Sequence, residues 1–301
     1  MTLPRQVLPG CFYLLTRRCT QRQFLLRPDD ATNNAFVYCL AEAAERFQIE
    51  VIIAQQMSNH HHTTLFDRYG RIIEFAAHFH KMLAKCQNSL RGRWENMWST
   101  HPPSIVRLVD RNDVIDKIVY TATNPVLDHL VDRVDHWPGP KTVRAFLRQE
   151  PLRAHRPAHF FREKGVMPAS VTLNFTIPPE LGDGEALIAE VRTRIAAVEL
   201  ECARQRMSSG RRIVGRGVIL RQPWHASPET LEPRRQMSPR VAAKSKWTRI
   251  EALQRNREFL DDYRRALRAW LAREQLGGEP VIFPAGTYWL VRHANVAVHA
   301  N

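Results

Sequence analysis

Residues 49–67 read IEVIIAQQMSNHHHTTLFD, and this stretch decides the fold. Its first part, IEVIIAQQ, is rich in β-branched residues, which favour strands. A polar break follows, and HHHTTLFD then has the character of a second strand. We therefore expect two adjacent strands joined by a short turn, with three consecutive histidines, His60, His61 and His62, on the second strand.

Further elements are predicted on both sides of this pair. Apolar residues recur at helical spacing over 30–47, after Asp and Thr capping candidates, and again over 71–90. The runs 11–17 and 102–109 favour strands, and 112–134 favours a helix. The order strand, helix, strand, strand, helix, strand, helix indicates an α+β fold: an antiparallel-rich sheet with helices packed mainly on one face.

A break in composition at HWPGPKTVR, residues 136–144, predicts a domain boundary. We expect one domain over 1–140 and a basic, mixed C-terminal region over 141–301, which could serve as an accessory DNA-binding domain. Elements predicted in the second half are a strand over 170–178, helices over 184–206 and 246–274, and basic loops between the two helices.

The net charge is the informative bulk property. The chain carries 44 Lys and Arg against 30 Asp and Glu, a formal net charge of +14. A surplus of this size favours polyanionic partners, and nucleic acid is the best match for a chain with no long apolar segment. The composition is otherwise that of a globular protein, with 44% hydrophobic residues.

Cellular location is predicted from what the sequence lacks. No run approaches the roughly 20 apolar residues of a membrane span, and the first residues lack the pattern of a signal peptide. The five cysteines are widely spread, with no C-x-x-C pair. We expect reduced thiols, a cytoplasmic protein and no membrane partner.

The strongest candidate for chemistry is the histidine cluster. Side chains alternate along a strand, so His60 and His62 should project to one face about 7 Å apart, while His61 points to the other. Two imidazoles on one face can share a metal ion and leave coordination positions open for substrate. An H-x-H pair alone is weak evidence, because structural histidines with satisfied hydrogen bonds give the same pattern.

A second candidate pair lies in the helix predicted over 112–134. Tyr120 and Asn124 are four residues apart, which puts a phenol and an amide on one helix face. The alternative is that Tyr120 is an amphipathic core residue and Asn124 ends or kinks the helix before Pro125. Taken alone, this pair does not separate the two interpretations.

Three segments together resemble single-tyrosine HUH transposases, especially REP-associated tyrosine transposases and their domesticated relatives. QQMSNHHHTTLF resembles the M-P-N-H-x-H strand of that family, ENMWS resembles its G-x-L-W-Q stretch, and VYTATNPVLDHLVDRVDHWPG resembles its R-Y-I-x-x-N-P-V run with a downstream tryptophan. Order and spacing agree over roughly residues 8–140. Ser58 stands where the family usually has proline, and His61 where it has an apolar residue.

The resemblance implies a ferredoxin- or RRM-like HUH catalytic domain and a role for each matched residue. His60 and His62 would bind the metal, Mg²⁺ or Mn²⁺, with Asn124 completing the site, and Tyr120 would be the nucleophile. A phenol has an ordinary pKa near 10, so it needs a nearby cation or base to attack at neutral pH. The implied reaction nicks single-stranded or hairpin-bearing DNA through a 5′-phosphotyrosine, leaves a free 3′-OH, and can be reversed to rejoin strands.

Arginine-rich segments are the candidate DNA contacts, since guanidinium groups track phosphates and tryptophan can stack on bases. A solvated basic surface is an equally good interpretation of the same pattern. The candidates are Arg17, Arg18, Arg22, Arg211, Arg212, Arg216, Arg221, Trp224, Arg234, Arg235 and Arg240.

Two other functions stay open. A domesticated DNA-binding protein could keep this fold without cleavage, although binding gives no reason to retain both histidines, the tyrosine and the asparagine. An RNA-binding or RNA-processing protein would also show a basic surface. Whether the site is built from one chain or shared in a homodimer is not encoded in these motifs.

Overall fold

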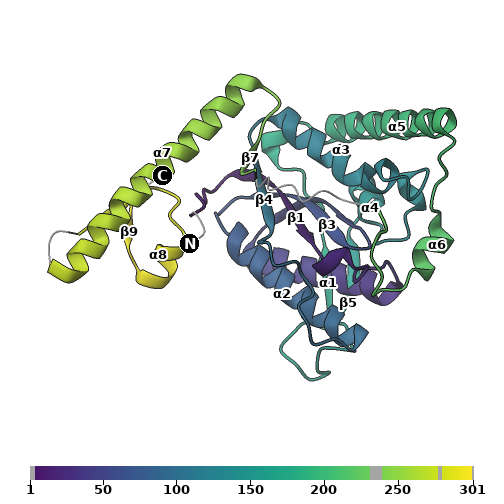
Figure 1. The fold of residues 1–301 in the computed structure, drawn as a ribbon, viewed down its shortest axis with the longest axis horizontal. Helices are drawn as coiled ribbons and strands as arrows, with labels where there is room; N and C mark the ends of the chain where they lie inside the picture. The colour runs from purple at the N-terminus through teal and green to yellow at the C-terminus, as the bar shows by residue number, and fades with distance from the viewer. Residues whose placement is uncertain (1–3, 231–238, 277–279, 300–301) are drawn as a thin grey trace.

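The computed structural model describes residues 4–230, 239–276 and 280–299, and its centre is a five-stranded sheet (Figure 1). The strands run in the order β2-β3-β1-β4-β7. The first four pair antiparallel, and β7 pairs parallel to β4. The α+β class and the antiparallel-rich sheet predicted from the sequence are confirmed. The strands are β1 (Cys11–Arg18), β2 (Glu50–Gln56), β3 (His60–Asp67), β4 (Ser104–Leu108) and β7 (Val241–Ala242).

Helices cover both faces of this sheet. α1 (Asp30–Phe47) and α2 (Ile72–Arg91) lie on one face, and α3 (Arg111–Leu127) lies on the other with α5 (Gly184–Ser209) beside it (Figure 1). The prediction that helices pack mainly on one face is therefore wrong. The signal was present in β2, which is buried at every residue after its first and has four consecutive apolar residues, VIIA, at positions 51–54. Strands covered on both faces lose the alternation of polar and apolar residues.

Side-chain caps explain where the helices begin. The Asp29 carboxylate accepts a hydrogen bond from the backbone nitrogen of Thr32 at 2.9 Å, at the start of α1. Asp67 accepts from the backbone nitrogens of Arg71 and Ile72 at the start of α2. Carboxylates in these positions satisfy amide groups that lack partners in the first helical turn. Asp67 is thus a cap, as expected for a carboxylate near a helix start.

The core continues past residue 140. α4 (Thr142–Arg148) and the hairpin of β5 (Leu152–His155) and β6 (Ser170–Leu173) contribute buried side chains to the same hydrophobic cluster as the sheet. α6 (Arg216–Arg221) forms within a segment predicted to be a loop. The division of the chain at residue 140 stays a prediction. Three single 3₁₀ turns cover Thr20–Arg22, Val134–His136 and Pro179–Leu181.

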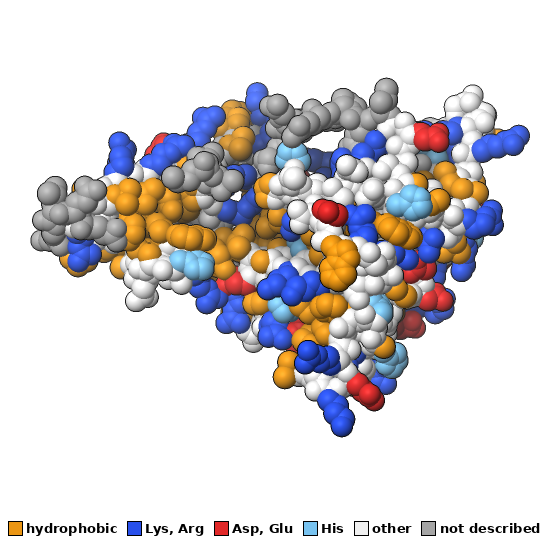
Figure 2. Space-filling model, turned by 60° about the horizontal axis from the view of Figure 1, so that its bottom comes forward, with side chains coloured by type: hydrophobic (Ala, Val, Ile, Leu, Met, Phe, Trp, Pro, Cys, Tyr) orange, Lys and Arg blue, Asp and Glu red, His pale blue; other side chains and the backbone are white. Residues whose placement is uncertain are grey.

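The last described residues form a C-terminal arm (residues 246–276 and 280–299), which projects to the left in Figure 1. It is tied to the N-terminal segment by a hydrogen bond of 3.0 Å from the Val7 nitrogen to the Gly286 oxygen. Hydrophobic side chains gather on it in Figure 2. Leu271 and Trp289, which belong to the arm, are exposed. The arm consists of α7 (Lys246–Leu276), β8 (Ile282–Phe283), α8 (Trp289–Ala294) and β9 (Ala297–Val298).

Two sequence expectations concern the whole chain. Within the three described ranges, no helix combines the length and apolar character that crossing a membrane requires. All five cysteines are buried and free of disulfides, as expected.

Candidate active site

Two histidines of β3 lie together on the sheet face that α3 covers. The rings of His60 and His62 have centroids 4.9 Å apart. Nδ1 of His62 hydrogen bonds to Oγ1 of Thr16, its partner on β1, at 2.8 Å, and Nδ1 of His60 contacts Oδ1 of Asn59 at 2.7 Å. Contacts of this kind fix the orientation of an imidazole ring. Burial, together with the charge of His60, holds the pKa of His62 well below its usual range, so this ring is neutral at pH 7.

Tyr120 meets this pair from α3. Its ring stands edge to face against His62, with centroids 5.1 Å apart, and 36% of the residue is exposed to solvent. The Lys117 ammonium nitrogen lies 5.4 Å from the centroid of the same ring. Burial raises the pKa of the Tyr120 phenol, the charge of Asp128 adds to the rise, and a hydrogen bond from Asn124 opposes it. In this state the phenol is protonated at neutral pH, so its use as a nucleophile would require added positive charge.

Asn124 is 4% exposed, and its Oδ1 is buried with no hydrogen-bond partner among the described residues. A buried amide oxygen without a partner costs free energy, and native structures rarely keep one without a reason. α3 continues through Pro125 and ends two residues later, so the proline neither splits the helix nor moves Asn124 from the face of Tyr120. The helix ends at Leu127, earlier than the predicted end near residue 134.

His60, His62 and Asn124 carry donor atoms of the kinds that a divalent metal can accept, namely imidazole nitrogens and an amide oxygen. In the described part of the chain, no group of three His, Cys, Asp or Glu side chains could hold a metal ion. A site here would therefore use two imidazoles and one amide oxygen, with water and a phosphate in the remaining positions. Mg²⁺ and Mn²⁺ accept such sets, because they commonly retain waters and bind substrate phosphates.

The middle histidine belongs to the opposite face. His61 Nε2 lies 2.8 Å from His80 Nε2, and both rings pack among aromatic side chains of α1 and α2. Burial lowers the pKa of His61 to about 3, with smaller contributions from His60 and Arg17, so it is uncharged in the folded protein. His61 and His80 therefore form part of the core.

α3 is anchored from outside by ion pairs at Asp116. Its carboxylate contacts Arg194 of α5 and the Lys244 ammonium, just before α7. The Lys244 backbone nitrogen also donates to Asp113 Oδ1 at 2.8 Å. The helix that carries Tyr120 is thus held by elements from the second half of the chain.

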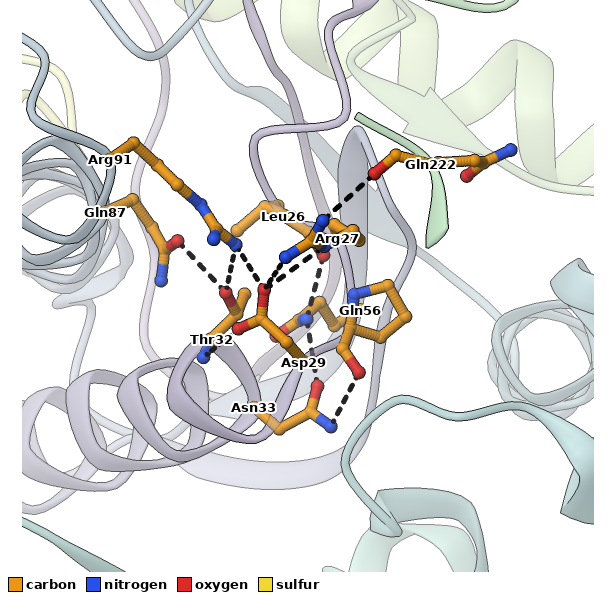
Figure 3. Close-up of polar contacts among 10 residues, drawn as sticks. Leu26, Arg27, Asp29, Thr32, Asn33, Gln56, Gln87, Arg91 and Gln222 are labelled. Carbon is orange, nitrogen blue, oxygen red and sulfur yellow. Dashed lines mark hydrogen bonds and ion pairs between the residues drawn. The ribbon is translucent and has the colours of Figure 1, made fainter. Parts of the chain in front are cut away.

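A hydrogen-bond network around the start of α1 holds the turn between β2 and β3 (Figure 3). Gln56, the last residue of β2, donates from Nε2 to Asn33 Oδ1 at 3.2 Å. Its carbonyl oxygen accepts from the indole nitrogen of Trp137 at 2.8 Å. Arg91 reaches Asp29 at 2.6 Å and ties α2 to the cap of α1. This network fixes the strand end from which the histidines follow.

The arginines predicted on β1 and after it have different surroundings. Arg17 is half-buried on the face of α2, with Nη1 3.3 Å from His80 Nδ1, so it points away from Tyr120. Arg18 is exposed, and its charge contributes to lowering the pKa of His62. Arg22 donates to the Thr230 carbonyl oxygen at 2.6 Å. Of these three, Arg18 is the one near the candidate site.

The arginines predicted as DNA contacts in the second half of the chain also differ in their surroundings. Arg211, Arg212, Arg216 and Arg221 are exposed, and the segment carrying them runs beside the residues after α3, with the Gly215 nitrogen 2.9 Å from the Leu130 oxygen. The remaining predicted contacts have other surroundings. Trp224 is half-buried, with the Arg93 guanidinium 5.8 Å from the centroid of its ring. Arg240 donates to the Pro4 oxygen at 2.6 Å. Arg234 and Arg235 lie outside the described residues.

Thr16 and Lys117 contact the candidate site without having been predicted. Lys117 precedes Tyr120 by three residues on the helix, a spacing that was visible in the sequence. Thr16 is brought to His62 by the register between β1 and β3, which no local pattern encodes.

Comparisons with known proteins give a distant likeness. No family model matches the chain, and no curated protein matches it. A solved structure of a REP-associated tyrosine transposase bound to a REP hairpin shares 16% identity, with a TM-score of 0.41, over 49% of this chain and 86% of the other. An identity of 16% with a TM-score of 0.41 does not establish a function for this chain.

Proposed function

We propose that this protein is a metal-dependent enzyme that nicks and rejoins single-stranded DNA, with Tyr120 as the nucleophile. The observation that carries the proposal is the convergence of Tyr120 and Asn124 on α3 with His60 and His62 on β3. These residues come from elements about 60 positions apart in the chain, and they meet on one face of the sheet. The strand order β2-β3-β1-β4, with α1 and α2 on one face, also fits the ferredoxin-like plan implied by the resemblance.

The residues of the chain supply the nucleophile and its surroundings. Oη of Tyr120 attacks the phosphorus, the bond from phosphorus to O3′ breaks, and the 3′ oxygen leaves as a hydroxyl after taking up a proton. The product is a 5′-phosphotyrosine, which conserves the phosphodiester and lets a 3′-OH reverse the reaction. Lys117 beside the ring favours the phenolate, and the Asn124 amide orients the hydroxyl.

A divalent metal would be held by His60, His62 and Asn124. When bound, it polarises the scissile phosphate and supplies positive charge that lowers the pKa of the phenol. The neutral imidazole of His62 suits this role because a protonated ring cannot bind a metal. The hydrogen bonds at Nδ1 direct the opposite ring nitrogen, Nε2, to the ligand position.

The DNA partner would follow the positive surface around this site. Arg18 lies at its edge, and Arg211, Arg212 and Arg216 are exposed on the segment beside the end of α3. Single-strand binding through such a surface should weaken steeply with salt.

The test is a covalent-complex assay. The purified protein is incubated with labelled single-stranded DNA from the flanks of its own gene, with Mn²⁺ or with chelator, and resolved on a denaturing protein gel. We expect a labelled, Mn²⁺-dependent band that Tyr120→Phe removes. Tyr69→Phe is the matched control, since Tyr69 is exposed and loses the same hydroxyl.

Two outcomes would replace the proposal. Tight binding of every flanking strand with no covalent band would make the protein a DNA-binding protein without cleavage. Preference for RNA over a matched DNA strand in competition would favour an RNA-binding function.

A further inference from the structure

A pocket lined by four arginines lies on the side of the molecule where α7 meets the edge of the sheet. The guanidinium groups come from four separate segments: Arg5 before β1, Arg107 on β4, Arg240 before β7 and Arg255 on α7. The buried Tyr13 of β1 contributes to the lining beside its strand partner Arg107. The pocket lies on the opposite face of β1 from Thr16 and the candidate active site, because odd and even residues of a strand face opposite ways.

The chain holds these side chains in fixed places. Arg5 donates from Nη1 to the Ile105 oxygen, and Arg240 donates from Nη1 to the Pro4 oxygen at 2.6 Å. The backbone nitrogen of Arg107 donates to the Arg240 oxygen at 2.9 Å. The guanidinium of Arg5 has five N–H donors, so it can bond the Ile105 oxygen and also donate to a ligand.

Positive charge predominates among the side chains that line the pocket. Among the described residues that line it, none is Asp or Glu. Arg255 has an exposed partner, Glu251, at 2.5 Å, and the nearby Asp67 is engaged by backbone nitrogens at the start of α2. Burial, and then the charge of Arg240, lower the pKa of Arg5 to about 10, so Arg5 stays protonated at neutral pH at a cost in free energy. A bound anion would offset that cost.

The volume of the pocket indicates which anion could fit in it. The cavity measures about 30 Å³. A water-sized group needs roughly 10–15 Å³ on this measure, so two or three oxygen atoms fit. The non-bridging oxygens of one phosphate group match this number, whereas a sugar or a base is too large. Arginine forks pair with phosphate oxygens in planar geometry.

We propose that this pocket is a phosphate-binding site, in which Arg5, Arg107, Arg240 and Arg255 hold the oxygens of one phosphate group. Because the four arginines come from four segments, the bound phosphate also fastens α7 to the sheet. The phosphate is either free or part of a nucleic-acid strand. The site is independent of the chemistry at Tyr120.

The experiment is calorimetric titration of the full chain with inorganic phosphate. We expect saturable binding near one phosphate per chain and a loss of at least tenfold in affinity in Arg107→Gln and in Arg255→Gln. Arg255 lies on the surface of α7, so its variant should fold even if Arg107→Gln does not. Arg257→Gln is the matched control, because Arg257 is exposed on the same helix and does not line the pocket. Tyr120→Phe should bind phosphate like the parent, which separates this proposal from the catalytic one.

A second arm identifies the source of the phosphate. If the group belongs to a nucleic-acid strand, inorganic phosphate should displace labelled single-stranded DNA at constant ionic strength. Arg255→Gln should then lower the slope of DNA affinity against salt by about one phosphate contact. If the ligand is free phosphate, neither change occurs while phosphate binding persists. Equal phosphate affinity in the parent, Arg107→Gln and Arg255→Gln, or no saturable binding by the parent, would overturn the proposal.

Discussion

Gly139→Ala should destabilise the protein far more than its size suggests. A Cβ built on Gly139 would overlap Nε1 of Trp137, would lie 2.7 Å from Cδ1 of the same ring and would come within 3.3 Å of the Gln56 oxygen. Trp137 is 2% exposed, so its indole has no solvent to move into. Displacing the ring breaks its 2.8 Å hydrogen bond to the Gln56 oxygen at the end of β2. The substitution therefore perturbs both packing and the turn that leads to the histidines.

The magnitude follows from these two effects. Overpacking a tight site costs about 1–3 kcal/mol. Leaving the buried Gln56 carbonyl oxygen without its donor costs about 1–3 kcal/mol more. We expect the free energy of unfolding to fall by about 2–6 kcal/mol, measured by urea denaturation with the slope of the transition checked for constancy.

Gly184→Ala is the matched control for this change. A Cβ at Gly184, the first residue of α5, meets Ile177 at 3.5 Å, an ordinary contact. Alanine is the better helix former by up to about 1 kcal/mol, so this variant should be as stable as the parent or more so. If Gly139→Ala were as stable as Gly184→Ala, the fixed position assigned to Trp137 would be refuted.

Three further predictions concern the candidate site and the histidine core. Asn124→Ala should lower Mn²⁺ affinity about 10- to 100-fold by calorimetry, as loss of a ligand or its support does in other metal sites, and unchanged affinity would remove Asn124 from the metal site. Lys117→Gln should move the pH midpoint of covalent-complex formation upward, because the phenolate loses a neighbouring cation; an unmoved midpoint would exclude that role. The pKa of His61 is about 3 in the folded protein and near 6.5 when unfolded, so the unfolded chain binds the proton first as pH falls. Thermal stability should therefore decline from below about pH 6.5 toward pH 3, and a His61→Gln variant that declined just as steeply would contradict this account.

The sequence predicted those parts of the fold and site that depend on local pattern. Alternation along β3 placed His60 and His62 on one face and His61 on the other, and the structure has this arrangement. The spacing of Tyr120 and Asn124 likewise placed both on one face of α3. Such patterns are visible because strand and helix geometry repeats over two to four residues. The roles assigned to these residues stay predictions.

Long-range features could not be predicted in the same way. The helix α3 was predicted, but its position on the second face of the sheet was not, because the residues of β2 and β3 do not say what covers them. The arginine pocket joins residues from Arg5 to Arg255, and nothing in any one segment marks it. Arg240 was predicted to be a DNA contact, but its position beside Pro4 became visible only with the fold.

The nucleophile and the two histidines of the proposed metal site stand on separately anchored elements. His60 and His62 belong to the central sheet, whereas Tyr120 lies on α3 together with Asn124, and Asp116 of this helix contacts Arg194 and Lys244. A DNA end attached to Tyr120 would therefore be carried by the helix and not by the sheet. Its position relative to His60 and His62 would depend on the ion pairs that hold α3 from outside, and these pairs come from the second half of the chain.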